Sequence, residues 1–422
     1  MKKSRIIFAL CTILIGILFT GGYQISMLEV NASSSKTPAN AMPTTGKKIK
    51  IPDVSIESRK IPNNDALKFV KDMRIGWNLG NTFDAAFDNP NFDDELLYES
   101  AWSGVKTTKE MIDAVKKAGF NAIRIPVSWH NHVSGNNFTI SKAWLNRVQE
   151  VVDYAMKDGM YVIINIHHDI MPGYYYPSSQ HMKTSIQYVK SIWTQIANKF
   201  KTYNNHLIFE SVNEPRLTGT KYEWWLDMNK DECKDAVESI NKLNQVFVDT
   251  VRATGGNNAS RYLMVPGYDA SPDYALIKEF KMPTDKSKYK NRIIVSVHAY
   301  RPYNFALQSP NESGSTSEWS IDSEYSRRDI DYFMDGLYDK FISKGIPVVI
   351  GEFGARDKNG NLQARVEYAT YYIKAARARG MTCFWWDNNA FYGDGENFGL
   401  LDRSTVTWKY PDIVAALMKY AK

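Results

Sequence analysis

A strand-like segment followed by a helix-like segment occurs eight times in this chain, and this repetition constrains the fold more than any other feature. The strand-like segments are short and rich in β-branched and aromatic residues. Several are apolar without interruption, as is typical of parallel strands covered on both faces. They are Met73–Gly80, Ala122–Val127, Tyr161–His168, Leu207–Asn213, Tyr262–Gly267, Ile293–Tyr300, Pro347–Phe353 and Met381–Trp386. Eight such units in about 360 residues predict an α/β fold of the (β/α)8 TIM-barrel type.

Amphipathic segments separate these strands and give the expected helices. Thr107–Ala118 begins with Thr and Glu and ends before Gly119, which are typical helix start and stop signals. The comparable segments are Ser141–Lys157, Thr184–Lys201, Lys234–Ala253, Ser326–Lys344, Leu362–Arg379, Pro411–Lys422 and, most weakly, Pro272–Glu279. A doubly wound open sheet is the alternative, and it is disfavoured because no Gly-rich phosphate loop follows the first strand. We predict a single barrel domain over residues 61–422.

The N-terminal segment has the organisation of an export signal. Basic residues among the first five precede the apolar run 6–19, and small residues follow at positions 30 and 32. This order is typical of a secretory signal peptide, and the apolar run is short for a membrane-spanning helix. We expect a signal peptide over residues 1–32, cleavage near Ala32 and a secreted protein, with retention as an anchor as the alternative. Residues 33–60 are rich in Ser, Thr, Pro, Asn and Lys and predict a flexible, solvated linker.

The formal charge of +6 belongs to this N-terminal part of the chain. Residues 1–60 contain nine basic and three acidic residues, whereas residues 61–422 contain 43 of each sign. A neutral domain argues against nucleic acid as a partner, although a local basic patch stays compatible with it. Beyond the expected signal peptide only Cys233 and Cys383 remain, which do not form a disulfide framework.

Polar residues stand where seven of the eight strands end. The carboxyl ends of barrel strands, with the loops that follow them, build the active site in this fold. The residues at these positions are Asn78 and Asn81, Arg124, the run His167, His168 and Asp169, the pair Asn213 and Glu214, His298 and Tyr300, Glu352, and the pair Trp386 and Asp387. Core packing does not explain such a pattern, so we expect a functional site at this end of the barrel.

Two carboxylates in this set indicate the chemistry. Glu214 in SVNEP and Glu352 in VIGEFG end the fourth and seventh strands. Hydrolysis of a glycosidic bond uses two carboxyl groups, and at a separation of about 5–5.5 Å one acts as nucleophile and the other as acid and base. Glu210 shares the side-chain direction of Glu214, because strand side chains alternate, and should lie deeper in the barrel, paired with Arg124.

The neighbouring residues fit roles in this chemistry. Arg124 is a permanent cation that would keep a nucleophilic carboxylate ionised, and Tyr300 could donate a hydrogen bond to the same carboxylate. Asn213 could bond the sugar 2-hydroxyl, a contact that strengthens in the transition state. His298 could hold the acid and base Glu214 as it changes protonation state.

The run from His167 to Asp169 raises the question of a metal. Adjacent residues of a regular strand point to opposite faces, and no further ligand cluster with suitable spacing is evident, so we expect no metal and no cofactor. We expect His167 and His168 to be hydrogen-bonding partners in the active site instead.

Aromatic residues make up 13% of the chain, and part of this content could stack on sugar rings. Trp386 is expected as the floor of the site, with its neighbour Trp385 facing the other way and Trp193 in the core. The Trp residues in loops after strands, which could also stack on sugars, are Trp102, Trp129, Trp224, Trp225 and Trp319.

The chain resembles glycoside hydrolase family five, the cellulase family A, on motifs that span residues 65–390. The motifs are GWNLGNT at 76–82, IRIPVSW at 123–129, INIHHD at 164–169, FESVNEPRLTGTKYEW at 209–224, VHAYRP at 297–302, VIGEFGA at 349–355 and FWWDN at 384–388. The resemblance implies that Glu214 is the acid and base and Glu352 the nucleophile of a retaining barrel glycosidase. It also implies that the rest of the site comprises Arg124, His167, His168, Asn213, His298, Tyr300 and Trp386. The motif HAYRP departs from the family pattern at Arg301, where a second aromatic residue is more usual.

The resemblance is greatest to the bacterial endo-β-1,4-glucanase branch. It implies a secreted, retaining endoglucanase acting on cellulose and related β-glucans, with xyloglucan, mannan or xylan as alternative preferred substrates. A barrel that binds polysaccharide without cleaving it is a more distant alternative, which the presence of both carboxylates disfavours. The partner is then a β-glucan; we expect a monomer without a dockerin or carbohydrate-binding module.

Overall fold

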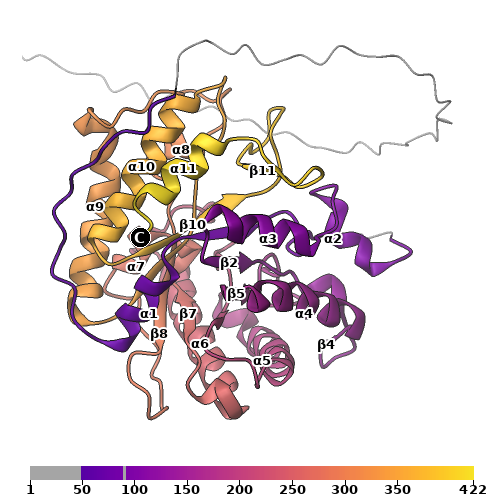
Figure 1. Ribbon diagram of the computed structural model, residues 1–422. Helices are drawn as coiled ribbons and strands as arrows, with labels where there is room; N and C mark the ends of the chain where they lie inside the picture. Colours follow the sequence, from indigo (N-terminus) through magenta and orange to yellow (C-terminus); the bar gives the residue numbers. More distant parts are fainter. Residues whose placement is uncertain (1–48, 89–91) are drawn as a thin grey trace, which may run out of the picture. The chain divides into compact units, whose positions relative to one another are not determined.

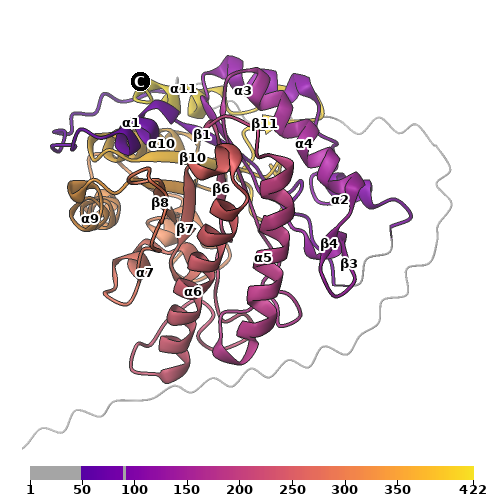
Figure 2. The same ribbon diagram turned by 90° about the horizontal axis from the view of Figure 1, so that it is seen from below.

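The computed structural model describes residues 49–88 and 92–422. Within them, eight parallel strands close into a barrel in the order β1-β10-β9-β8-β7-β6-β5-β2, with helices outside (Figures 1 and 2). The strands are β1 Gly76–Leu79, β2 Ala122–Ile125, β5 Tyr161–Asn165, β6 Leu207–Glu210, β7 Leu263–Pro266, β8 Ile293–His298, β9 Val348–Phe353 and β10 Thr382–Asp387. The predicted (β/α)8 barrel is therefore confirmed, and each strand lies within or next to its predicted segment.

The predicted helices surround this barrel with small shifts at their ends. They are α3 Lys109–Ala118, α4 Lys142–Lys157, α5 Met182–Lys199, α6 Asp231–Ala253, α7 Pro272–Leu276, α9 Glu324–Lys340, α10 Leu362–Ala378 and α11 Pro411–Lys419. Further short elements are α1 Asp65–Met73, α2 Tyr98–Ala101, α8 Tyr303–Ala306 and the two-stranded sheets of β3 Val133–Ser134 with β4 Thr139–Ile140 and of β11 Leu401–Asp402 with β12 Thr407–Trp408. Single 3-10 turns are η1 Glu95–Leu97, η2 His130–His132, η3 Ser179–His181, η4 Gly256–Ala259, η5 Tyr268–Ala270 and η6 Ile342–Lys344.

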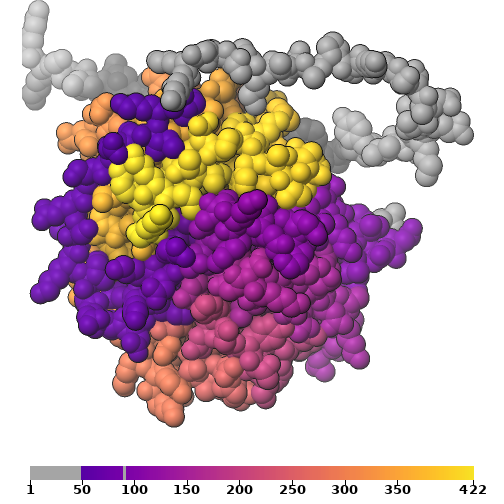
Figure 3. Space-filling model, in the orientation of Figure 1, coloured from indigo at the N-terminus to yellow at the C-terminus, as the bar shows by residue number. Residues whose placement is uncertain are grey.

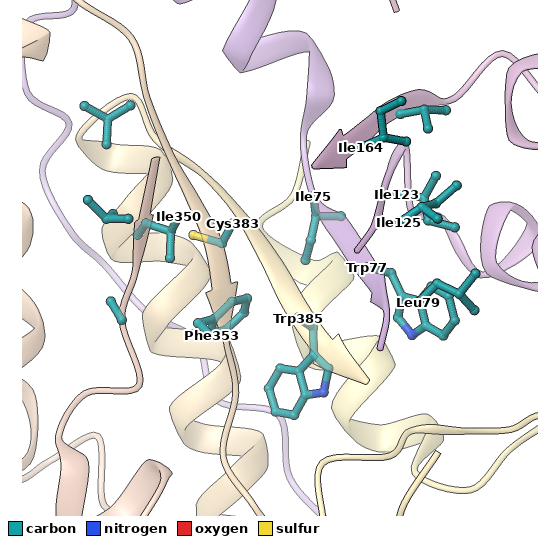
Figure 4. Close-up of a cluster of buried hydrophobic side chains, with 14 of the residues drawn as sticks. Ile75, Trp77, Leu79, Ile123, Ile125, Ile164, Ile350, Phe353, Cys383 and Trp385 are labelled. Atoms are coloured by element: carbon teal, nitrogen blue, oxygen red, sulfur yellow. The ribbon is translucent and has the colours of Figure 1, made fainter. Parts of the chain in front are cut away.

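The strand side chains that point outward form the larger core, against the helices. Figure 4 shows part of it, with Trp77, Ile123, Ile350 and Trp385 among the labelled side chains. Each of these residues is fully buried. Burial at about 25 cal/mol per Å² of apolar surface makes this layer the main source of stability.

The end of the barrel at which the strands begin, its amino-terminal end, is filled by apolar side chains and covered by α1. Inward residues such as Ile163, Met264 and Phe384 form one buried cluster with Val70 and Met73 of the helix. Phe69 stacks on Tyr262 with ring centroids 3.7 Å apart. The amino-terminal end of the barrel is thus closed by packing, which leaves the carboxyl ends of the strands for chemistry.

Because Gly76 has no side chain, the Phe384 ring can occupy the space next to it inside the barrel. A Cβ at position 76 would lie 2.0 Å from Phe384 Cδ1. We expect Gly76→Ala to lower the free energy of unfolding by about 1–3 kcal/mol, because the buried ring has no room to withdraw. Urea denaturation measures this, with Gly173→Ala as control, since a Cβ there meets no atom within 4 Å. Equal stability of the two variants would contradict the packing described here.

The second part of the predicted linker, residues 49–60, is not a flexible, solvated segment. Residues 49–60 lie against the barrel domain, and Ile51 and Val54 are partly buried on its core. The Val54 amide donates to the Tyr420 hydroxyl at 2.7 Å, and Arg59 pairs with Asp335 at 2.7 Å. Figure 3 shows this indigo segment beside the yellow C-terminal residues. The few apolar residues of this segment are spaced among polar ones, a pattern that is also typical of a solvated chain. The prediction for residues 49–60 was wrong because these few residues do pack on the domain.

The expected signal peptide at residues 1–32 and the first part of the linker lie outside the described residues. Among residues 49–88 and 92–422, no helix combines the length and apolar character that crossing a membrane requires.

Candidate active site

The barrel interior becomes polar one layer above its apolar floor. The inward residues of this layer are Asn78, Arg124, Asn165, Glu210 and Ser296, all fully buried. Side-chain hydrogen bonds connect them, because Arg124 donates to Asn78 and Glu210, and Asn165 and Ser296 both donate to Glu210. Residues i and i+2 of a strand both point into the barrel, so the interior changes from apolar to polar side chains within two residues.

Arg124 organises this polar layer. Its Nη1 donates to Glu352 Oε1 at 2.6 Å, its Nε donates to Glu210 Oε2 at 2.8 Å, and its Nη2 donates to Asn213 Oδ1 at 2.7 Å. Burial opposes its charge, but the carboxylates of Glu210 and Glu352 outweigh burial and raise its pKa. The predicted position of Glu210, deep in the barrel and paired with Arg124, is confirmed.

Both oxygens of Glu352 are held by hydrogen bonds. Oε1 accepts from Arg124, and Oε2 accepts from the Tyr300 hydroxyl at 2.8 Å. Burial and the charge of Glu352 raise the pKa of Tyr300 well above its usual value, so the phenol keeps its proton and donates it. A carboxylate that accepts hydrogen bonds at both oxygens and is paired with a cation is held in a fixed orientation, as a nucleophile must be.

Glu214 faces Glu352 across the mouth of the barrel. One oxygen of each carboxylate and a nitrogen of His298 lie within 4.8 Å of one another. His298 Nδ1 lies 2.7 Å from Glu214 Oε1 and donates to it. Burial lowers the pKa of His298, but Glu352 and Glu214 outweigh burial and raise it. Burial raises the pKa of Glu214, but His298 and Arg216 outweigh it and lower the pKa.

Two predicted site residues support the site from below. Asn78 is fully buried; its Oδ1 accepts from Arg124 and its Nδ2 donates to the Gly351 carbonyl at 2.9 Å. Asn213 is buried and uses Oδ1 on Arg124. Both side chains thus orient the guanidinium, and contact of Asn213 with a sugar hydroxyl stays a prediction.

The hydrogen bonds of Asn165 show which ring nitrogen of His167 carries the proton. Asn165 Oδ1 accepts from the Val127 amide, so its Nδ2 faces His167 Nδ1 at 3.1 Å and donates to it. His167 Nε2 therefore carries the ring proton. Burial lowers the pKa of His167 well below its usual value and that of His168 to about 4, so both rings are uncharged at neutral pH.

His167 and His168 do not point to opposite faces of a strand, although the prediction that this run binds no metal assumed that they do. The strand β5 ends at Asn165, so His167 and His168 do not alternate; their rings lie 4.4 Å apart, and both approach Asp84 within 4.8 Å. The hydrogen bond from Asn165 argues against His167 Nε2 as a ligand, because that nitrogen is protonated. Asp169 accepts from His130, Trp129 and Tyr188 and is structural.

The aromatic residues divide by exposure. Trp386 lies parallel to the His167 ring with centroids 6.0 Å apart, next to Gly80, which leaves it room. Trp102 lies 5.7 Å from His168, and Trp102, Trp224 and Trp225 are 40%, 51% and 76% exposed. Trp129 and Trp319 are buried, so the prediction that they stack on sugars was wrong. Their positions in loops suggested exposure, yet each indole donates to a backbone carbonyl. Trp193 and Trp385 are buried as predicted.

Two charged residues next to Glu214 were missed as site residues. Arg216 Nη1 donates to the Glu214 carbonyl at 3.0 Å and lies 3.4 Å from Glu214 Oε2. Asp269 follows β7, the one strand for which no polar end had been assigned, and lies 3.9 Å from Arg216 Nη1. Its position three residues after the end of a barrel strand was the available signal.

A (β/α)8 barrel with two carboxylates facing each other at the carboxyl ends of its strands has the architecture of a glycoside hydrolase. The model of the family described as Cellulase (glycosyl hydrolase family 5) matches residues 84–392. The chain belongs to this family, as the sequence motifs predicted.

Relatives of known activity extend this result. The chain is 44% identical to endoglucanase A of Clostridium longisporum over 369 residues, 86% of this chain and 67% of that protein. A family 5 lichenase from Caldicellulosiruptor sp. F32 is 80% identical over 89% of this chain and all of that chain, with a TM-score of 0.88; its mutant has been solved with cellotetraose. A xyloglucan-specific endo-β-1,4-glucanase from a metagenomic library is 38% identical over 84% of this chain and 98% of that chain, with a TM-score of 0.74. The chain is an endo-β-1,4-glucanase, and the predicted enzyme class is confirmed.

Proposed function

We propose that this endoglucanase works by double displacement, with retention of anomeric configuration. The observation that carries the proposal is the approach of Glu214 and Glu352 to within 4.8 Å between oxygens. A retaining enzyme needs its carboxyl groups about 5–5.5 Å apart, whereas an inverting enzyme needs about 6.5–9.5 Å to admit a water between sugar and base.

The surroundings of the two carboxylates assign their roles. Glu352, held by Arg124 and Tyr300, attacks the anomeric carbon while Glu214 gives its proton to the leaving oxygen. The glycosyl ester on Glu352 is then cleaved by water, from which Glu214 takes a proton. His298 holds Glu214 at 2.7 Å through both steps.

We propose linear β-glucans as substrates, with mixed-linkage β-glucan ahead of cellulose. The 80% identity to a lichenase and the cellotetraose complex of its mutant support this order. Xyloglucan is the second candidate, supported by the xyloglucan-specific neighbour. Mannan and xylan rank lower. The exposed rings of Trp102, Trp224 and Trp225 provide apolar faces suited to stacking on sugars of such a chain.

Initial rates on lichenan, carboxymethyl cellulose, xyloglucan, glucomannan and xylan test the substrate order. We expect the highest kcat/KM on lichenan, with measurable cleavage of carboxymethyl cellulose and a rapid fall in viscosity, as internal cleavage requires. A higher kcat/KM on xyloglucan than on either unbranched glucan would overturn the order in favour of the second candidate.

We also propose that the protein is exported and cleaved near Ala32. The basic start, apolar run 6–19 and small residues at 30 and 32 support this. Expression of the full chain in a secreting bacterium should give extracellular enzyme whose N-terminal sequence begins near residue 33. Enzyme retained in the membrane fraction with an intact N-terminus would show an anchor instead.

A further inference from the structure

Asp269 is a half-buried carboxylate on the edge of the active site with no assigned role. It lies in η5, and its amide donates to the Pro215 carbonyl at 2.9 Å, which ties it to the segment that follows Glu214. The side chain is 17% exposed, and among the described residues its Oδ1 is buried without a hydrogen-bond partner. Asp269 and Ala270 both have left-handed backbone angles, with φ of 54° and 46°. Such a conformation costs free energy for a residue with a side chain, above all for Ala270, and has to be held by the surrounding structure.

Arg216 connects Asp269 to the proposed acid. The same nitrogen, Nη1, lies 3.4 Å from Glu214 Oε2 and 3.9 Å from Asp269 Oδ1. The guanidinium is fixed on its other sides, because Nε lies 3.4 Å from Glu223 Oε1 and the group covers the Trp224 ring at 4.3 Å. A single cation therefore stands among three carboxyl groups, those of Glu214, Glu223 and Asp269.

This arrangement matters because Glu214 has to carry a proton at the start of the reaction. A fixed cation beside a carboxyl group favours its ionised form, which is the wrong form for a general acid. A second carboxyl group on the same cation opposes that effect, because two neighbouring carboxyl groups compete for one proton and titrate as a pair.

We propose that Asp269 is a positioning residue that balances the charge of Arg216 while Glu214 holds the proton for the leaving oxygen. In the state that donates, Glu214 holds the proton and Asp269 is ionised and paired with Arg216. Burial and the charge of Glu214 raise the pKa of Asp269, whereas His298 and Arg216 outweigh burial and lower the pKa of Glu214, so the proposed state is reached when the proton of the pair moves from Asp269 to Glu214. The inference rests on the proposed double displacement.

Other titratable groups face this pair from every side, and they stay in place when Asp269 is changed. These groups, of which His168 and Tyr175 are uncharged at neutral pH, are His298 from β8, Glu352 from β9, His168 and Tyr175 from the segment after β5, Glu223 from the segment after β6, and Glu396 from the segment after β10. A shift that follows a change at position 269 alone is therefore due to the Asp269 carboxyl group.

The test compares pH profiles of kcat/KM for the wild type, Asp269→Asn and Arg216→Met on cellotetraose. The amide introduced by Asp269→Asn cannot ionise, so the basic limb should move to lower pH by about one unit, and activity above that limb should fall about tenfold. Arg216→Met removes the cation and should move the basic limb to higher pH. Opposite shifts are a signature that a purely structural role would not produce.

Two controls complete the experiment. With 2,4-dinitrophenyl β-cellobioside, whose leaving group needs no proton, Asp269→Asn should retain kcat/KM within about twofold of the wild type. Asp285→Asn removes a partly buried partner of Arg252, whose Nη2 lies 2.8 Å from Asp285 Oδ2. Asp285 lies in the loop before β8, at the amino-terminal end of the strands and away from the site, so this variant should leave the pH profile unchanged.

An unshifted basic limb in Asp269→Asn, or an equal loss on both substrates, overturns the role of Asp269 while the wild type stays active. If Asp269→Asn does not fold, the pH profile of Arg216→Met decides. A basic limb that stays at the wild-type pH or moves to lower pH in that variant overturns the inference. A wild type that cleaves neither substrate overturns the proposed function and this inference with it.

Discussion

Replacing Glu352 by Gln should lower kcat/KM on lichenan by about 10⁴-fold or more, because an amide cannot form the glycosyl ester. The fold should survive. Gln has nearly the same shape, and Arg124 keeps its partner Glu210 at 2.7 Å. Activity on 2,4-dinitrophenyl β-cellobioside should fall equally, since a better leaving group does not replace a missing nucleophile. Circular dichroism and thermal melting check the fold.

The matched control is Glu150→Gln, the same chemical change at an exposed carboxylate of α4 that pairs with Arg147. It should leave kcat/KM unchanged. Activity of Glu352→Gln within about tenfold of the wild type would show that another group attacks the sugar.

Replacing Glu214 by Ala should give a loss that depends on the leaving group. On lichenan the sugar leaving group needs a proton, so kcat/KM should fall by about 10²–10⁴-fold. On 2,4-dinitrophenyl β-cellobioside the first step needs no acid, and the glycosyl-enzyme should accumulate because no base activates water. A burst of dinitrophenol followed by slow turnover is the expected stopped-flow trace.

Azide distinguishes the two carboxylates further. It is a nucleophile that needs no base, so it should accelerate the slow step of Glu214→Ala and give a β-glycosyl azide. An equal loss on both substrates without a burst, or no response to azide, would contradict the role of Glu214 as acid and base.

The barrel and most of its site could be predicted because both depend on local patterns. Strand alternation alone placed Glu210 below Glu214 and next to Arg124, and the salt bridge is present at 2.7 Å. Glu214 and Glu352 are far apart in the chain, but a closed parallel barrel brings all strand ends to one face.

The errors fall where tertiary contacts decide. Trp129 and Trp319 follow strands, yet packing buries them. Residues 49–60 have little apolar content and still lie on the domain through single contacts such as Val54 with Tyr420. His167 and His168 share a side of the site because β5 ends before them.

The role of Asp269 also depends on geometry that no local pattern contains. Its carboxylate lies 3.9 Å from Arg216, in a turn with left-handed backbone angles whose amide donates to the Pro215 carbonyl. The sequence shows only an Asp after a strand. That Asp269 and Glu214 lie next to the same cation, Arg216, is visible only in the folded chain.

The central claim is that Glu214 and Glu352 cooperate in a double displacement. Proton NMR of cellotetraose hydrolysis, recorded within the first minutes and before mutarotation, tests it most directly. Two inversions at the anomeric carbon predict that the β-anomer of the newly formed reducing end appears first, with the α-anomer growing only as mutarotation proceeds. An α-anomer as the first product would show single displacement by water and would contradict the assignment of Glu352 as nucleophile.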